Sequence, residues 1–206
     1  MSRGVALKAV AQGPQLLGYF ACIGLGYIIV EVALLQRLTL LLEHPAYAAA
    51  AVIAAMLVSS GVGSMLWFRT AAAGRARLVK IGFGGVLALL AAHTLFGYQI
   101  IHALLGLPLA AKIVCAALLL VPLGLLMGIP LPAGMSVAAN SGPGAVAWCW
   151  AVNGAASVVA SSLAVVLAMG FGFAAAIGVG LISYAGAGGL MWMMGRGTET
   201  APAALP

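Results

Sequence analysis

Charged side chains are scarce in this 206-residue chain, and aspartate is absent. Charged residues make up 6% of the sequence, whereas hydrophobic residues make up 65%. A soluble domain carries roughly 25% charged residues, so the composition excludes a soluble globular protein and a disordered chain. The few carboxylates are Glu31, Glu43 and Glu199. Without aspartate, the sequence excludes EF-hand calcium sites, paired-aspartate catalysis and Ser-His-Asp triads.

Cysteine is also sparse, and no metal-ligand spacing occurs. Cys22, Cys115 and Cys149 stand apart from one another, with no CxxC or Cys/His motif. The sequence therefore indicates neither a zinc site nor a disulfide framework. The net charge is +6, but the basic residues sit at the edges of apolar runs, where they orient a chain in a bilayer. We therefore expect a lipid bilayer, and no nucleic acid, as the partner of this surface.

Long apolar runs dominate the chain instead. Crossing about 30 Å of hydrocarbon takes about 20 helical residues, and this measure predicts an all-α, polytopic transmembrane helix bundle of about six spans. We place them near 16–42, 46–68, 81–101, 113–132, 146–169 and 173–194. They form one domain over 1–196, and the Ala-, Pro- and Thr-containing tail 197–206 is expected to be disordered.

The connections between the spans carry an uneven charge. Basic residues gather at the amino terminus, in the connection 69–80 and at Arg196, whereas the first, third and fifth connections are nearly neutral. By the positive-inside rule, both termini are cytoplasmic and the protein is a multi-pass protein of the cell's inner (plasma) membrane.

Glu31 is the most informative polar residue, because it falls near the middle of the first span. If that span is one helix, it is about 40 Å long. A carboxylate at such depth should be neutral, paired or in contact with a water-filled cavity. Two interpretations stay open: a proton or cation site, and a structural hydrogen-bond anchor to Asn153 or to a serine of another span.

Other polar residues within the apolar runs could join Glu31. Asn153 should bond either Glu31 or a freed backbone carbonyl, and Gln36 and Arg37 could belong to the same cluster. Arg37 could equally snorkel to the interface. His44, in Glu43-His44-Pro45, is expected to be a turn residue.

His93 and His102 raise the question of haem, but nine residues separate them on one predicted helix, so they cannot clamp one iron. We expect no haem, no other cofactor and no metal. The prolines at 122, 130 and 132 interrupt the fourth span. A helix end and turn near the cytoplasmic side explains them more simply than a substrate-binding helix break.

Two stretches carry a family resemblance. The run GLGYIIVEVALLQRLTLLLEHPAYAAAAVIAAMLVSSGVGS, at 24–64, and the segments 128–132 and 148–157 resemble the membrane-spanning module of spermidine synthase-like (aminopropyltransferase-like) proteins. In that family the chemistry belongs to a soluble Rossmann-like domain with catalytic aspartates, which this sequence does not contain. The resemblance therefore implies a shared membrane architecture, and it does not imply aminopropyl transfer.

Two functions compete at this point. The first is a non-catalytic membrane subunit or anchor, with other membrane proteins or further copies of itself as partners. It fits the small size and the many small residues spaced four apart, such as Ser59 with Gly63 and Ala176 with Gly180. The second is a small oligomeric transporter of a polyamine or other organic cation, which uses Glu31. No catalytic constellation can be assembled, so we do not expect an enzyme.

Overall fold

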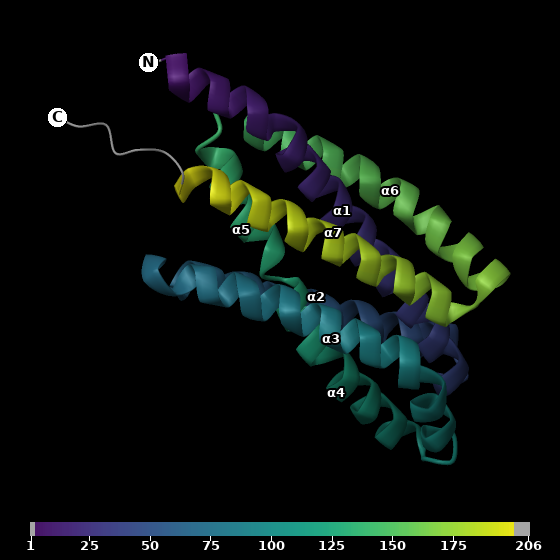
Figure 1. The fold of residues 1–206 in the computed structure, drawn as a ribbon. Coiled ribbons are helices and arrows are strands. Elements are labelled where there is room, and N and C mark those ends of the chain that lie inside the picture. Colours follow the sequence, from purple (N-terminus) through teal and green to yellow (C-terminus); the bar gives the residue numbers. More distant parts are fainter. Residues whose placement is uncertain (1–2, 200–206) are drawn as a thin grey trace.

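The computed structural model describes residues 3–199, with side chains described for 13–195. Within this part the chain is entirely helical apart from short turns (Figure 1). The helices are α1 (Arg3–Leu42), α2 (Pro45–Arg69), α3 (Ala72–Leu104), α4 (Leu109–Met127), α5 (Pro130–Ala139), α6 (Ala145–Phe171) and α7 (Phe173–Glu199). The predicted all-α fold is confirmed.

Six stretches of the described chain are long and apolar enough to cross a membrane. They are Gly13–Leu42, Pro45–Arg69, Ala72–Leu104, Leu109–Ala139, Ala145–Phe171 and Phe173–Gly195. This result confirms the predicted six spans, and it shows that α4 and α5 together make the fourth crossing. Many large apolar side chains remain exposed on the outer surface, among them Leu57, Val158 and Met169, as expected of a surface that faces lipid tails.

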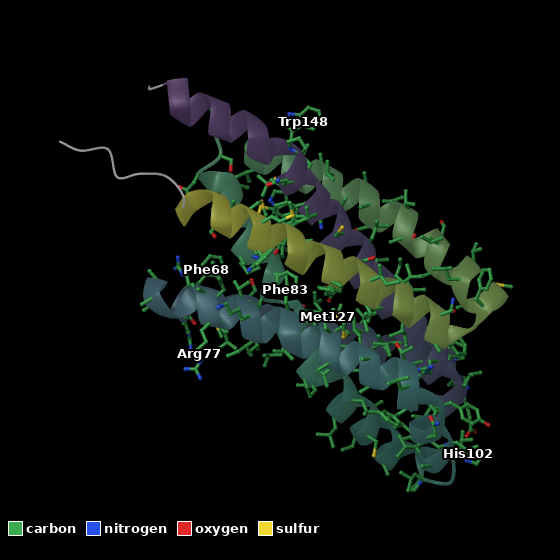
Figure 2. The ribbon with its side chains drawn as sticks, in the orientation of Figure 1. Phe68, Arg77, Phe83, His102, Met127 and Trp148 are labelled. Atoms are coloured by element: carbon green, nitrogen blue, oxygen red, sulfur yellow. The ribbon has the colours of Figure 1, made fainter. Side chains whose placement is uncertain are left out.

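Consecutive spans run in opposite directions, so the connections gather at two ends of the bundle (Figure 1). One end holds the start of α1, the α2–α3 connection, the α5–α6 connection and the end of α7. Phe68 and Arg77 lie at this end, His102 lies at the opposite end, and Met127 lies between them (Figure 2). The first end is the one that the charge bias predicts to be cytoplasmic.

Helix α1 is the centre of the bundle. It packs most extensively on α6 and α7, while α2 packs mainly on α4 and α3 packs on α7 and α4. The side chains of Tyr19, Phe20, Leu34 and Leu41 on α1 are almost fully buried. Because α1 is central, its polar residues lie beside other helices.

The fourth crossing and the tail differ from the prediction. We expected the fourth span to end at Pro132, but helix resumes at Pro130 and runs through Ala139. Proline is tolerated in the first turn of a helix. Within lipid, a helix satisfies the hydrogen bonds of the backbone N–H and carbonyl groups. Residues 197–199 belong to α7, so this part of the tail predicted to be disordered is helical, because extending an existing helix costs little. Residues 200–206 lie outside the described part of the chain.

Small residues bring α2 and α4 into backbone contact. Gly63 on α2 lies against the Leu125 carbonyl, and Gly128, just after α4, lies against the Ser60 carbonyl. Such pairs of small residues let helix backbones approach closely in lipid. Elsewhere Gly180 on α7 packs on Val30 of α1. These small residues, which could also have formed a face for another subunit, serve packing inside the bundle.

Candidate functional site

A cavity of about 360 Å³ lies between the helices where α4 stops and α5 begins, and it opens to the surface of the bundle beside the exposed Leu57 and Gly61 of α2. Met127, at this break, lies about midway between the two ends of the bundle (Figure 2). The wall is mostly apolar. Its polar side chains are hydroxyls from α1, α2, α6 and α7 and one amide from α6. It comprises Ile23, Gly24, Tyr27, Leu57, Ser60, Gly61, Ser64, Met127, Gly128, Pro130, Leu131, Asn153, Ser157 and Tyr184.

The break in the fourth crossing follows from two prolines. Because Pro130 and Pro132 have no N–H, the carbonyls of Leu126 and Gly128 lose the donor four residues ahead. The Leu126 carbonyl instead accepts a bond from the Ile129 N–H at 3.3 Å, whereas no described main-chain group donates to the Gly128 carbonyl. From the sequence, these prolines were expected at a helix end near the cytoplasmic side. The structure instead places a mid-membrane break there, beside a cavity.

Asn153 on α6 forms the cavity wall next to α1. Its side-chain amide donates to the Phe20 carbonyl at 3.0 Å, and the Ser157 hydroxyl donates to the Asn153 carbonyl at 2.8 Å. Gly24 permits this contact, because a Cβ there would lie 2.6 Å from the Asn153 carbonyl oxygen. The expected pairing of Asn153 with Glu31 does not form. Asn153 bonds an ordinary helical carbonyl of α1 instead.

Two tyrosines lie on the cavity wall. The Tyr27 and Ser60 hydroxyl oxygens are 3.4 Å apart, which links α1 to α2. The Tyr184 ring packs on Gly26, where a Cβ would lie 2.9 Å from a ring carbon. Tyr184 is 1% exposed, and its hydroxyl makes no hydrogen bond with the described residues. Every fully buried side-chain nitrogen or oxygen among these residues has a hydrogen-bond partner, so the Tyr184 hydroxyl oxygen keeps some accessible surface. The Tyr184 hydroxyl is therefore open to the cavity.

Glu31 lies one turn beyond Tyr27 on α1 and is half-buried. Its carboxylate makes no hydrogen bond or ion pair with the described residues, and Glu31 is not part of the cavity wall. Gln36 is also half-buried. The expected cluster of Glu31, Gln36, Arg37 and Asn153 does not assemble, because six residues of helix turn Arg37 to a different face from Glu31.

Arg37 points into the bundle instead of snorkelling to the interface. It is 7% exposed, and its Nη1 donates to the His93 carbonyl of α3 at 2.8 Å. The His93 ring is buried as well. Arg37 and His93 thus form a second polar site, towards the end of the bundle where α1 ends.

The remaining histidines lie at this end too. His44 is exposed as the N-cap residue of α2, with its ring 5.3 Å from the Tyr47 ring. His102 lies in the last turn of α3, 6.0 Å from the Tyr98 ring. Within the described part of the chain, no three His, Cys, Asp or Glu side chains are grouped as metal ligands.

An ion pair joins two connections at this end. Lys112 at the start of α4 donates from Nζ to Glu43 Oε1 at 2.6 Å. Lys112 lowers the pKa of the exposed Glu43 carboxyl by hydrogen bonding and by its charge. Glu43 ends α1 with a left-handed backbone, φ 61°. The pairing of Glu43 with Lys112 could not be predicted from the sequence, because the two residues belong to different connections.

The residues that the sequence argument missed are Tyr27, Ser60, Ser64 and Tyr184. Serines spaced four apart are also typical of helix packing, and the tyrosines look like ordinary aromatic residues of apolar spans. Comparisons with protein-family models, with curated proteins and with solved structures give no match to this chain. The site therefore has to be interpreted from its own chemistry.

Proposed function

We propose that this multi-pass membrane protein is a small transporter that binds a polar organic solute, of the amine or alcohol class, in the cavity beside the α4–α5 break. The observation that supports this role is the uncapped Gly128 carbonyl and the unpartnered Tyr184 hydroxyl on one cavity wall. Broken helices of this kind offer backbone dipoles to solutes in transporters.

The cavity has the chemistry of a solute site. Ligand pockets are mostly apolar with a few polar groups that orient the ligand, and this wall matches that description. A carbonyl and hydroxyls can accept hydrogen bonds from an ammonium or hydroxyl group. Two tyrosine rings favour a cation on their faces.

A thermal-shift screen of the purified protein tests this role. The probes are spermidine, putrescine, choline and a matched set of neutral alcohols. A solute that binds the cavity should raise the unfolding temperature of the wild type, and the shift should be lost in Tyr184→Phe, which removes one oxygen. Tyr98→Phe is the control, because Tyr98 is 74% exposed. Labelled uptake into liposomes by the wild type and both variants then tests transport.

Three results would contradict the proposal. The first is that no probe shifts the wild-type unfolding temperature. The second is an equal shift in Tyr184→Phe and the wild type. The third is binding without any uptake, which would leave a binding protein and exclude a transporter.

A non-catalytic subunit or anchor is the second candidate, favoured by the outer face of α6. Small residues make up much of one exposed face of this helix, which also contains Val158: Ala147, Ala151, Gly154, Ala155 and Ser162. A Cβ on Gly154 would meet no atom of the chain within 4 Å, so this glycine is not needed for internal packing. Close helix contacts in lipid use such faces. Gly154→Leu should disrupt a complex or a homo-oligomer on a native gel and leave the monomer folded.

We also propose a cellular location and a family relation for this protein. We propose that the chain has no catalytic role and lies in the cell's inner (plasma) membrane with both termini in the cytoplasm. The basic residues of the α2–α3 connection support this orientation. A relation to the membrane module of spermidine synthase-like proteins rests on the segments 24–64, 128–132 and 148–157. Reporter fusions at each terminus test the topology.

A further inference from the structure

Positive charge is concentrated at the connection between α2 and α3. Four of the nine lysines and arginines of the chain lie between positions 69 and 80: Arg69, Arg75, Arg77 and Lys80. Arg77 lies at the end of the bundle opposite His102 (Figure 2). Because both flanking helices are long enough to cross a membrane, this connection lies at a membrane surface, where lipid headgroups surround it.

No acidic residue with a described side chain balances this charge. Glu31 lies within the first crossing, and Glu43 lies at the opposite end of the bundle. Arg69, Arg77 and Lys80 are exposed, and their side chains make no hydrogen bond or ion pair with the described residues. Three exposed basic side chains are therefore available to an anion at this surface.

Arg75 holds the two helix ends of this connection together. Its Nε donates to the Thr70 carbonyl at 3.2 Å, and its guanidinium lies over the Trp67 ring, 5.2 Å from the ring centroid. A cation over an aromatic face is a favourable contact, and Trp67, only 6% exposed, is fixed by its packing. The contact joins the first turn of α3 to the last turn of α2, so the basic side chains of the two helices extend from a defined backbone.

The outer face of α3 joins basic side chains to an open apolar surface. Arg77 and Lys80 are three residues apart, which places their Cβ atoms about 5–6 Å from each other on one helix face. Further into the membrane the same exposed face contains Ile81, which is 51% exposed, and Gly84, where an added Cβ would meet no atom within 4 Å. An anion held by the two basic side chains would therefore lie directly above a surface that fits hydrocarbon.

We propose that Arg77 and Lys80 bind the phosphate of an anionic phospholipid, whose acyl chains lie along the outer face of α3 at Ile81 and Gly84. The other two basic residues of the connection add positive charge at the same surface. Each lysine or arginine near a membrane surface strengthens the attraction to anionic headgroups. A zwitterionic headgroup carries no net charge, so charge complementarity favours the anionic lipid. The lipid site is separate from the solute cavity, which lies about midway between the two ends of the bundle at Met127.

Thermal unfolding of the purified full chain in a neutral detergent tests the lipid site. The added probes are phosphatidylglycerol, phosphatidylcholine with the same acyl chains, and inorganic phosphate. A ligand that binds the folded state stabilises it in proportion to the logarithm of its concentration above Kd. Phosphatidylglycerol should raise the unfolding temperature more than phosphatidylcholine does, and about 1 M salt should reduce this difference by screening the exposed charges. Inorganic phosphate, which has no acyl chain, should leave the unfolding temperature unchanged.

Two double variants locate the site. Arg77→Gln with Lys80→Gln should raise the half-saturating concentration of phosphatidylglycerol about 30-fold, from the contribution of two basic residues near the surface. The charge-conserving control, Arg77→Lys with Lys80→Arg, should bind nearly as well as the wild type. Both variants should fold, because neither side chain bonds to the described residues.

Three results would overturn the lipid site. The first is equal stabilisation of the wild type by phosphatidylglycerol and phosphatidylcholine. The second is an unchanged half-saturating concentration of phosphatidylglycerol in the double glutamine variant. The third is equal stabilisation by inorganic phosphate and phosphatidylglycerol, which would indicate a site for a free anion in place of a lipid.

Discussion

Gly63 is the residue whose enlargement should most directly separate α2 from α4. A Cβ at Gly63 would collide with the Leu125 carbonyl oxygen, which belongs to the backbone of α4. A backbone carbonyl in a helix cannot rotate away as a flexible side chain can. Gly63→Ala therefore forces the two helices apart or bends one of them.

The magnitude follows from two opposing effects. Overpacking of a tightly packed interface typically costs about 1–3 kcal/mol, and contact with rigid backbone favours the upper part of this range. Replacing glycine by alanine inside a helix returns about 1 kcal/mol. We therefore expect Gly63→Ala to destabilise the folded state by about 1–2 kcal/mol.

Gly61 offers a matched control on the same helix, two residues away. A Cβ at Gly61 would meet no atom within 4 Å. Gly61→Ala should therefore stabilise the protein by up to about 1 kcal/mol through helix propensity alone. Thermal or denaturant unfolding of both variants in the same detergent, followed by helical circular dichroism, measures the difference.

The difference in stability between Gly63→Ala and Gly61→Ala tests the backbone contact between α2 and α4. If Gly63→Ala is as stable as Gly61→Ala, then the backbones of α2 and α4 are not in contact. The part of the cavity wall that these two helices form would then also differ from the one described. A loss of stability in Gly63→Ala alone supports the close contact. Solute binding should also weaken in Gly63→Ala, because Ser60 and Gly128 lie one turn along the same interface.

Two further predictions concern single polar contacts. The Tyr19 hydroxyl donates to the Pro130 carbonyl at 2.6 Å in the core, so Tyr19→Phe should cost about 0.5–1.5 kcal/mol by removing this hydrogen bond, with Tyr98→Phe as a neutral control in the same unfolding assay. Lys112 lowers the pKa of Glu43 in the folded state, so the stabilisation is present above the unfolded pKa of about 4.3 and is lost as the pH falls through the folded value. The unfolding temperature of Glu43→Gln should therefore fall less between pH 6 and pH 3 than that of the wild type, and equal pH profiles would contradict the pairing.

Much of the architecture follows from composition and spacing. Hydrophobic runs of membrane-spanning length, few charges and basic residues grouped in alternate connections predict six spans, because a bilayer admits only backbone that is internally hydrogen-bonded. The small residues at 59 and 63 also indicate close packing, although the sequence does not name the partner helix. These features depend on residues that are close together in the sequence, so they can be recognised from one sequence.

The partners of the polar residues could not be read from the sequence. Asn153 pairs with the Phe20 carbonyl and not with Glu31, because the depth and rotation of α6 against α1 set which atoms meet. Arg37 turns towards His93 because Gly97, sixty residues away, leaves room for its guanidinium. Such contacts depend on helix rotation and on side chains from distant spans.

Hydropathy and the length of the apolar runs are enough to predict a bundle of membrane-crossing helices, since both properties can be evaluated residue by residue along the chain. The position of the proline-interrupted fourth crossing beside a cavity with Tyr184 on its wall, and the burial of Arg37 inside the bundle, became known from the three-dimensional arrangement. Lipid tails exert the same apolar preference on every helix face, so hydropathy does not distinguish one face from another. Which face turns inward is decided by packing between helices, where small residues and hydrogen bonds select one arrangement.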